Sequence, residues 1–301
     1  MKITAFGWPL CICTLIAMLA GCGGSQPPVD APGAMLSQSD AGVQPHRIYV
    51  STNPGYAILT YRLDGEQTQP TISGVTNPWG LAVRNRKLYA VDYCNPSRCY
   101  VGSGEILAFT ITGASTKPTI SGLSGPKGIA VDAHGKIYVT NECKPTTCKG
   151  RGRVTTYDSA GNPSFPTIAI QQPRGVAVDD RGRISVTALD TLTTYLPNGH
   201  RTPPTIKGLS GPAGVAVDRN GKIYIVNQGT NTVMTYTPGG KRTAPTISDG
   251  LSSPYFLAIG DDGRIYVTNA GNSTVTTYDA NGKRIKPTIQ IPGGAVGIAV
   301  R

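Results

Sequence analysis

Short apolar segments alternate with polar turns along the chain, and the same arrangement recurs several times. The clearest copy, residues 126–141, reads PKGIAVDAHGKIYVTN, with two apolar segments around an Asp-x-x-Gly turn. Further copies begin at Pro173, Pro212 and Pro254, and a shorter copy occupies residues 78–92. A repeat of this kind determines the architecture, because each copy supplies one unit that buries its apolar face against its neighbours.

Each repeat contains four segments with the composition of β-strands. The first is apolar throughout, as expected for a strand that is buried on both faces. The second reads Lys/Arg-Ile-Tyr-Val, the third ends in an aromatic residue and the fourth contains Pro-Thr-Ile. Because proline cannot donate a ladder hydrogen bond, we expect the fourth strand to lie at the edge of its sheet.

The register of the repeats predicts the fold. The first segment occurs six times, at residues 81–83, 129–131, 176–178, 215–217, 257–259 and 298–300. The second also occurs six times, at residues 47–50, 87–90, 136–139, 183–186, 222–225 and 264–267. Four short strands per unit predict an all-β, six-bladed β-propeller. The first and last segments lack partners within their own repeats, so one blade should combine one C-terminal strand with three N-terminal strands.

Polar residues follow the apolar segments at fixed places. The Asp residues of the Asp-x-x-Gly sequences should accept local backbone hydrogen bonds, while the glycine adopts a positive φ. Asn141, Asn227, Asn269 and Asp92 end the second segments. Side-chain bonds to a neighbouring loop explain these four residues, and a weak cation site at Asp92 is the alternative.

The repeat resembles the NHL-type and YVTN-type propeller repeats over residues 46–301. The resemblance implies the fold but no single activity, since such propellers serve as binding platforms, sensor domains, lactonases or lyases.

The first 45 residues have a different composition. Met1-Lys2 precedes an apolar run at residues 5–20, which is short for a membrane span. The sequence Leu19-Ala20-Gly21-Cys22 resembles the lipobox of bacterial lipoproteins. By that resemblance residues 1–21 are a signal peptide and Cys22 is lipidated. Residues 22–45, rich in Gly, Ser and Pro, then form a flexible tether before the propeller at 46–301.

This N-terminus predicts an exported protein that is anchored to a bacterial membrane through lipid. Gly23 follows the cysteine, which in a Gram-negative host resembles a protein sorted to the outer membrane. The alternative is an ordinary secretory signal with an incidental cysteine. The formal net charge of +11 suits anionic surroundings or reflects solubility alone. We expect a monomer without a specific nucleic-acid site.

The loops that lead into the first strands of a propeller meet at the central mouth. The residue between Pro and Gly in each repeat should therefore line the rim, namely Trp79, Lys127, Arg174, Ala213, Tyr255 and Val296. The gluconolactonase-like and regucalcin-like propellers that the repeat pattern resembles carry Asn and Asp metal ligands at such positions. These rim residues are not good ligands for divalent metals, so we expect no metal site and no cofactor.

A second group of propeller enzymes, of the streptogramin-lyase type, depends on histidines. The chain has only His46, His134 and His200, at positions that predict no cluster. The sequence therefore favours a non-enzymatic binding or scaffold module for a protein, a polysaccharide or another anionic ligand. Trp79, Lys127, Arg174 and Tyr255 are the candidate ligand-binding residues, although they could simply cap buried strands. The alternative function is a lactonase-like hydrolase or lyase with an unrecognised site.

Two neighbouring repeats carry Cys-x-Pro-x-x-Cys insertions after the second segment. In an exported protein, Cys94 with Cys99 and Cys143 with Cys148 are expected to form local disulfides. A zinc site that joins the two loops, or a redox pair, is the alternative.

Basic residues surround these insertions. They should form a ridge on the mouth side, suited to phosphate or carboxylate partners, unless they are simply solvated. The ridge contains Arg98, Lys144, Lys149, Arg151 and Arg153.

Overall fold

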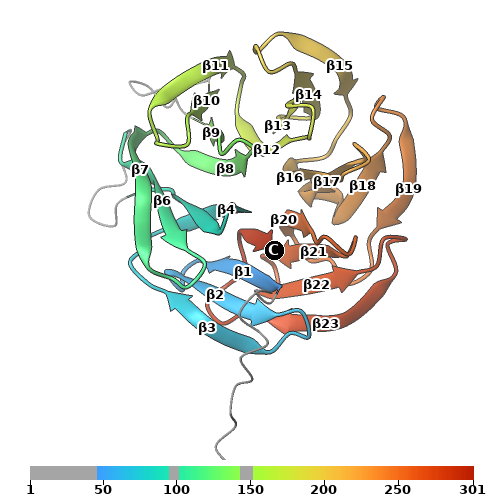
Figure 1. Ribbon diagram of the computed structural model, residues 1–301. Helices are drawn as coiled ribbons and strands as arrows, with labels where there is room; N and C mark the ends of the chain where they lie inside the picture. Colours follow the sequence, from blue (N-terminus) through green and yellow to red (C-terminus); the bar gives the residue numbers. More distant parts are fainter. Residues whose placement is uncertain (1–45, 95–101, 143–151) are drawn as a thin grey trace, which may run out of the picture. The chain divides into compact units, whose positions relative to one another are not determined.

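The chain folds into six four-stranded antiparallel sheets arranged as the blades of a β-propeller (Figure 1). The computed structural model describes residues 46–94, 102–142 and 152–301. Within these ranges the only helix is the short 3-10 helix η2 (Gln228–Thr230), and no helix is long and apolar enough to span a membrane. The all-β, six-bladed prediction is confirmed.

The four strands of each blade follow one another from the centre of the ring to its edge. Blade 1 consists of β24 (Ile298–Val300), β1 (Arg47–Thr52), β2 (Ala57–Arg62) and β3 (Gln67–Ile72). Blade 2 consists of β4 (Pro78–Arg84), β5 (Lys87–Asp92), β6 (Gly104–Thr110) and β7 (Ser115–Leu123). Blade 3 consists of β8 (Pro126–Val131), β9 (Ile137–Asn141), β10 (Arg153–Tyr157) and β11 (Pro163–Ala169).

The remaining blades repeat this order. Blade 4 consists of β12 (Pro173–Val178), β13 (Ile184–Ala188), β14 (Thr191–Tyr195) and β15 (Arg201–Ile206). Blade 5 consists of β16 (Pro212–Val217), β17 (Ile223–Asn227), β18 (Thr232–Tyr236) and β19 (Arg242–Ile247). Blade 6 consists of β20 (Pro254–Ile259), β21 (Ile265–Asn269), β22 (Thr274–Tyr278) and β23 (Arg284–Gln290). Every Pro-Thr-Ile segment lies in an outermost strand, as predicted.

Blade 1 closes the ring by joining the two ends of the propeller. β24 pairs antiparallel with β1, so that Ile48 lies opposite Val300 and Val50 lies opposite Ile298. Two backbone hydrogen bonds between Arg47 and Arg301, of 2.9 and 3.0 Å, extend the pairing. The predicted shared blade is therefore confirmed.

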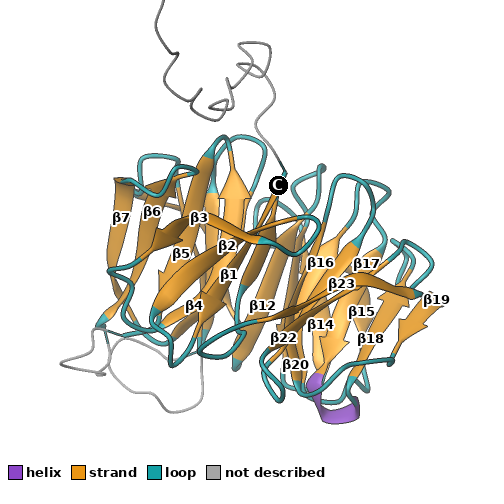
Figure 2. Cartoon of the chain, turned by 90° about the horizontal axis from the view of Figure 1, so that it is seen from below, coloured by secondary structure: helices purple, strands orange, loops and turns teal. Residues whose placement is uncertain are grey.

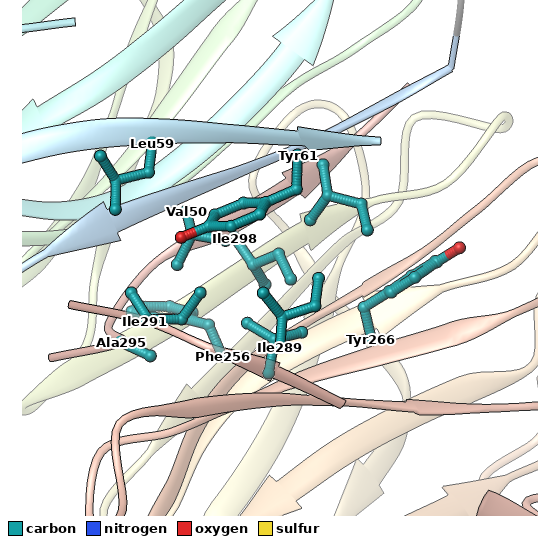
Figure 3. Close-up of a cluster of buried hydrophobic side chains, with 11 residues drawn as sticks. Val50, Leu59, Tyr61, Phe256, Tyr266, Ile289, Ile291, Ala295 and Ile298 are labelled. Atoms are coloured by element: carbon teal, nitrogen blue, oxygen red, sulfur yellow. The ribbon is translucent and has the colours of Figure 1, made fainter. Parts of the chain in front are cut away.

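Apolar side chains fill the spaces between neighbouring blades. The largest such cluster lies between blades 6 and 1, where Tyr61 and Ile298 pack with Phe256, Tyr266 and Ile289 (Figure 3). Burial of this kind supplies about 25 cal/mol per Å² of apolar surface. Most of the stabilising surface is thus created when one blade packs on the next.

The propeller has two distinct faces (Figure 2). We call one of them the mouth face. It carries η2, the loops that join second to third strands and the loops that lead into the first strands. The base face carries the remaining turns together with His46 and Arg301. At one base turn Asp132 Oδ1 accepts hydrogen bonds from the backbone N–H groups of His134 and Lys136, both 2.9 Å, and Gly135 has φ +83°. Asp179 and Asp218 do the same, which confirms the predicted turn role.

Buried hydroxyl groups join neighbouring blades beside the mouth. Thr187 Oγ1 accepts a hydrogen bond from Gly175 N in its own blade (2.8 Å) and donates one to the Ala213 carbonyl of the next blade (2.5 Å). Ser51, Thr140 and Thr268 form equivalent bridges to the rim carbonyls of Trp79, Arg174 and Val296. We call these four contacts hydroxyl bridges.

The blades approach one another so closely here that glycine is required. A Cβ atom at Gly128 would lie 2.5 Å from the Arg174 carbonyl oxygen, well inside van der Waals contact. Blade 6 carries Phe256 at the place of this glycine, and its N–H still donates to Thr268 Oγ1 (3.0 Å). Blades 2 and 5 lack the bridge because Val91 and Val226 replace the hydroxyl residue.

We predict that Thr187→Val lowers the free energy of unfolding by about 1–3 kcal/mol, because it leaves a buried N–H and a buried carbonyl without their partner. The reverse change, Val226→Thr, should supply the missing bridge in blade 5 and stabilise by about 1 kcal/mol. Urea denaturation of both variants measures the difference. Equal effects of the two substitutions would contradict the role given to the hydroxyl.

Candidate functional site

A β-bulge places one residue of each first strand at the mouth. In blade 2 the pairing register shifts between Pro78 and Leu81, and the equivalent shift occurs in blades 3 to 6. A bulge inserts one extra residue and redirects a side chain. The side chain of the rim residue thus departs from the alternation of side chains along the strand. The hydroxyl bridges fix the carbonyl group of the rim residue in four of the blades.

The rim brings aromatic residues from different blades together. The ring centroids of Trp79 and Tyr255 lie 5.3 Å apart at an interplanar angle of 74°, an edge-to-face arrangement. Tyr93 lies 5.4 Å from Trp79, and Phe256 lies 5.1 Å from Tyr255. Trp79 Nε1 donates to Asn77 Oδ1 (3.1 Å). These contacts join blades 2 and 6 across the mouth.

Lys127 lies beside this aromatic group, and its charge is paired. Its Nζ atom is 5.2 Å from the centroid of the Trp79 ring and 2.7 Å from Glu142 Oε2. The two side chains of the ion pair are 12% and 25% exposed, so the pair is partly shielded from water. Cation–π attraction and the ion pair together hold the ammonium group over the tryptophan.

Arg174 supplies the other rim cation. No carboxylate among the described residues forms an ion pair with it. Burial raises the pKa of the nearby Tyr255 phenol, and the positive charge of Arg174 partly opposes that rise, while Glu142 and Tyr93 add to it. The phenol therefore stays neutral well above physiological pH.

Below the rim, a cavity of about 40 Å³ lies among the first strands. Glycine and apolar residues line it, among them Phe256. A cavity of this size has room for water.

Asp92 anchors the loop that carries Asn77 and Trp79. Its two carboxylate oxygens accept hydrogen bonds from the N–H groups of Thr76 and Asn77 and from the Thr76 hydroxyl, at 2.8 to 2.9 Å. Asn227 and Asn269 similarly accept from Ser210 N and Ser252 N. This supports the structural interpretation of these residues. Among the described residues, no group of three metal-ligating side chains comes together.

The structure describes only some of the other candidate residues. Ala213 is fully buried, so only five of the six rim side chains reach the mouth. Arg153 begins β10 at the mouth face, and Cys94 is buried at the start of its insertion. Cys22, Arg98, Cys99, Cys143, Lys144, Cys148, Lys149 and Arg151 lie outside the described residues. Lipidation, the two disulfides and the basic ridge therefore stay predictions.

Two residues of the mouth were not predicted from the sequence. Tyr93 and Glu142 each follow directly the polar residue that ends a second strand. A comparison of that position between the repeats would have shown it to be variable, as the rim position is. Their contacts with Trp79 and Lys127 also depend on distances between blades, which the repeat pattern does not contain.

Solved propellers resemble this structure closely in fold. One, in a complex of nidogen with laminin, has a TM-score of 0.65 at 19% identity and covers 85% of this chain and 98% of its own. A protein of unknown function from Bacteroides caccae has the same TM-score at 13% identity, with coverages of 85% and 99%. A virginiamycin B lyase from Staphylococcus aureus, inactivated by a histidine-to-alanine change and bound to quinupristin, has a TM-score of 0.58 at 16% identity, with coverages of 86% and 85%.

These likenesses show the fold alone. No protein-family model and no curated protein matches the sequence. The resemblance to NHL-type and YVTN-type repeats therefore stays a prediction.

The raised pKa of Tyr255 predicts a change in alkaline stability. Above about pH 10 an unfolded tyrosine ionises while Tyr255 in the folded state stays neutral, so stability is lost as the pH rises. In Tyr255→Phe the free energy of unfolding should fall less steeply above pH 10, by up to about 1.4 kcal/mol per pH unit. Denaturant titrations between about pH 9 and 11.5 measure this slope. A slope equal to that of the unaltered protein would show that Tyr255 ionises in the folded state as it does in the unfolded state.

Proposed function

We propose that the protein is a non-enzymatic binding module whose ligand site is the mouth face. The observation that carries this proposal is the cluster of Trp79, Tyr93 and Tyr255 beside Arg174, a cation without a carboxylate partner among the described residues. Aromatic rings beside a guanidinium group suit a ligand with both a flat apolar face and an anionic group.

The ligand class follows from which of the two rim cations has a carboxylate partner among the described residues. Lys127 is neutralised by Glu142, so its contribution is to hold Trp79 in place. Arg174 is then the group that would form bidentate hydrogen bonds to a carboxylate or sulfate. Sugar rings stack well on aromatic side chains, which favours an acidic oligosaccharide over a simple anion.

The lyase alternative has less support. The solved lyase described above was inactivated by replacing a histidine, whereas all three histidines of this chain lie on the base face. His46 begins β1, His134 lies in the turn before β9, and His200 lies in the turn before β15. Among the described mouth residues, Glu142 acts electrostatically on Tyr255, and its charge is already paired with Lys127.

The proposed lipid anchor is compatible with a mouth that is open to ligands. The described chain begins at His46 on the base face, so a tether over residues 22–45 would join the propeller on the side opposite the mouth. Anchoring at Cys22 would then leave the mouth accessible.

Trp79 provides a direct test, because it is the only tryptophan once residues 1–21 are removed. Titration with oligogalacturonate, a carboxylated oligosaccharide, should change Trp79 emission, whereas neutral dextran should not. Arg174→Gln should weaken binding about tenfold or more, since it removes a charged hydrogen bond. Arg201→Gln, on an outermost strand, is the matched control and should bind normally.

Two results would contradict the proposal. One is unchanged emission with every acidic oligosaccharide tested. The other is equal affinity of the Arg174→Gln and Arg201→Gln variants.

A further inference from the structure

The inner turns of the base face, which join first to second strands, differ in charge between blades. In blades 3 to 6 these turns carry six carboxylates and six cationic side chains, so their charges cancel. The carboxylates are Asp132, Asp179, Asp180, Asp218, Asp261 and Asp262, and the cations are Lys136, Arg181, Arg183, Arg219, Lys222 and Arg264. At the same place, blades 1 and 2 carry five cationic side chains and no acidic side chain. We call this group the blade 1–2 patch: Arg47, Arg84, Arg86, Lys87 and Arg301.

The absence of acidic residues has a local structural cause. In blades 3 to 5 one Asp is needed as a backbone acceptor in a longer Asp-x-x-Gly turn. Blade 2 instead uses the two-residue turn Asn85-Arg86, in which both residues have positive φ, +50° and +61°. Blade 1 has no turn, because its first two strands come from opposite ends of the propeller. The carboxylate that balances the charge elsewhere is therefore missing in both blades.

No acidic side chain among the described residues forms an ion pair with a cation of the blade 1–2 patch. Ion pairs occur in the neighbouring inner turns, such as Arg183 with Asp179 at 2.7 Å. In the patch, Lys87 Nζ donates to the Lys117 carbonyl (2.9 Å) and the Arg47 guanidinium donates to the Gln69 carbonyl, both neutral acceptors. Arg84 and Arg86 are exposed to solvent.

Acidic groups border the patch in the inner turn of blade 6, where Asp261 and Asp262 line a pocket together with His46 and Val300, and in the outer turn of blade 1. Glu66 there pairs with Arg62 at 2.7 Å. Asp64 Oδ1 accepts a hydrogen bond from the Glu66 N–H. Asp261 and Asp262 pair with Arg219 and Arg264. Arg62, Asp64 and Glu66 together carry one net negative charge, so the five cations of the patch keep an excess of positive charge.

The two blades present the patch as one surface. β24 and β1 lie beside β4 (Figure 1). Tyr49 OH of blade 1 contacts the Ile111 carbonyl of blade 2 at 3.5 Å, and Ile111 N in turn donates to the Arg86 carbonyl. His46, where the described chain begins, adjoins Arg47 at the same place.

We propose that the blade 1–2 patch docks the base face on an anionic lipid bilayer. Each basic residue near such a surface strengthens attachment, and the attraction acts within a Debye length of about 8 Å. The proposed tether of 24 residues, 22–45, would reach about 25–30 Å and leads into His46, which adjoins Arg47, so it would keep these cations close to the headgroups. The positive charge of the blade 1–2 patch does not depend on any ligand at the mouth. Only the argument from the tether rests on the proposed lipid anchor.

The test uses the chain from residue 23 onward, without lipid, so that binding reports the protein surface. Co-sedimentation compares vesicles of phosphatidylcholine with vesicles containing about one third phosphatidylglycerol, at about 50 and 300 mM salt. We expect binding only to the anionic vesicles and a strong decrease at the higher salt concentration.

Two charge-reversal variants locate the surface. Arg84→Glu/Arg86→Glu/Lys87→Glu should weaken vesicle binding by at least about 30-fold, since three of the cations are lost. Lys241→Glu/Arg242→Glu/Lys283→Glu makes the same change in net charge in the outer turns of blades 5 and 6 and should weaken binding less than about threefold. Circular dichroism and urea denaturation establish that both variants are folded.

Equal losses in the two variants would overturn the proposal, because binding would then follow net charge alone. Failure to bind anionic vesicles would overturn it as well, including a result in which only a soluble polyanion such as heparin is bound. Trp79 emission with oligogalacturonate is measured on the same samples. A failure of the membrane proposal therefore remains distinguishable from a failure at the mouth.

Discussion

The architecture depends on one constraint, which is that the ring must close. Blades bury most of their apolar surface against one another, so an open ring would expose the faces of two blades at once. Closure is achieved by three residues, Ile298–Val300, paired with β1. The same contact continues to the mouth, because Gly297 N donates to Ser51 Oγ (2.7 Å), which donates to the Trp79 carbonyl (2.6 Å). The end of the propeller thus supports the aromatic rim.

The hydroxyl bridges explain why a repeat of modest strands produces a rigid mouth. Each bridge satisfies a buried N–H in one blade and a buried carbonyl in the next, which is costly to leave unmade. The glycine beside it allows the close approach, and the bulge directs the neighbouring side chain toward the axis. The scaffold therefore leaves two positions per blade free to vary, the rim residue and the residue after each second strand, and these positions determine the chemistry of the mouth.

The sequence predicted the fold well because each element is signalled locally. Periodic apolar segments, Asp-x-x-Gly turns and edge prolines all act over a few residues, and the offset between first and second segments predicted the shared blade. The hydroxyl bridges were not predicted, although Ser51, Thr140, Thr187 and Thr268 occupy one position of the repeat. Their role depends on the distance between adjacent blades. The pairing of Lys127 with Glu142 was missed for the same reason, and it changes which cation is available to a ligand.

Deletion of residues 297–301 tests the central role of closure most directly. The truncated chain loses β24 and the hydrogen bond from Gly297 to Ser51, so the account predicts a loss of stability throughout the ring. The midpoint of thermal unfolding should fall by about 10 °C or more, and the emission of Trp79 should shift toward that of an exposed tryptophan before heating. An unchanged midpoint together with unchanged Trp79 emission would contradict the account, because the ring and its mouth would then be stable without the closing strand.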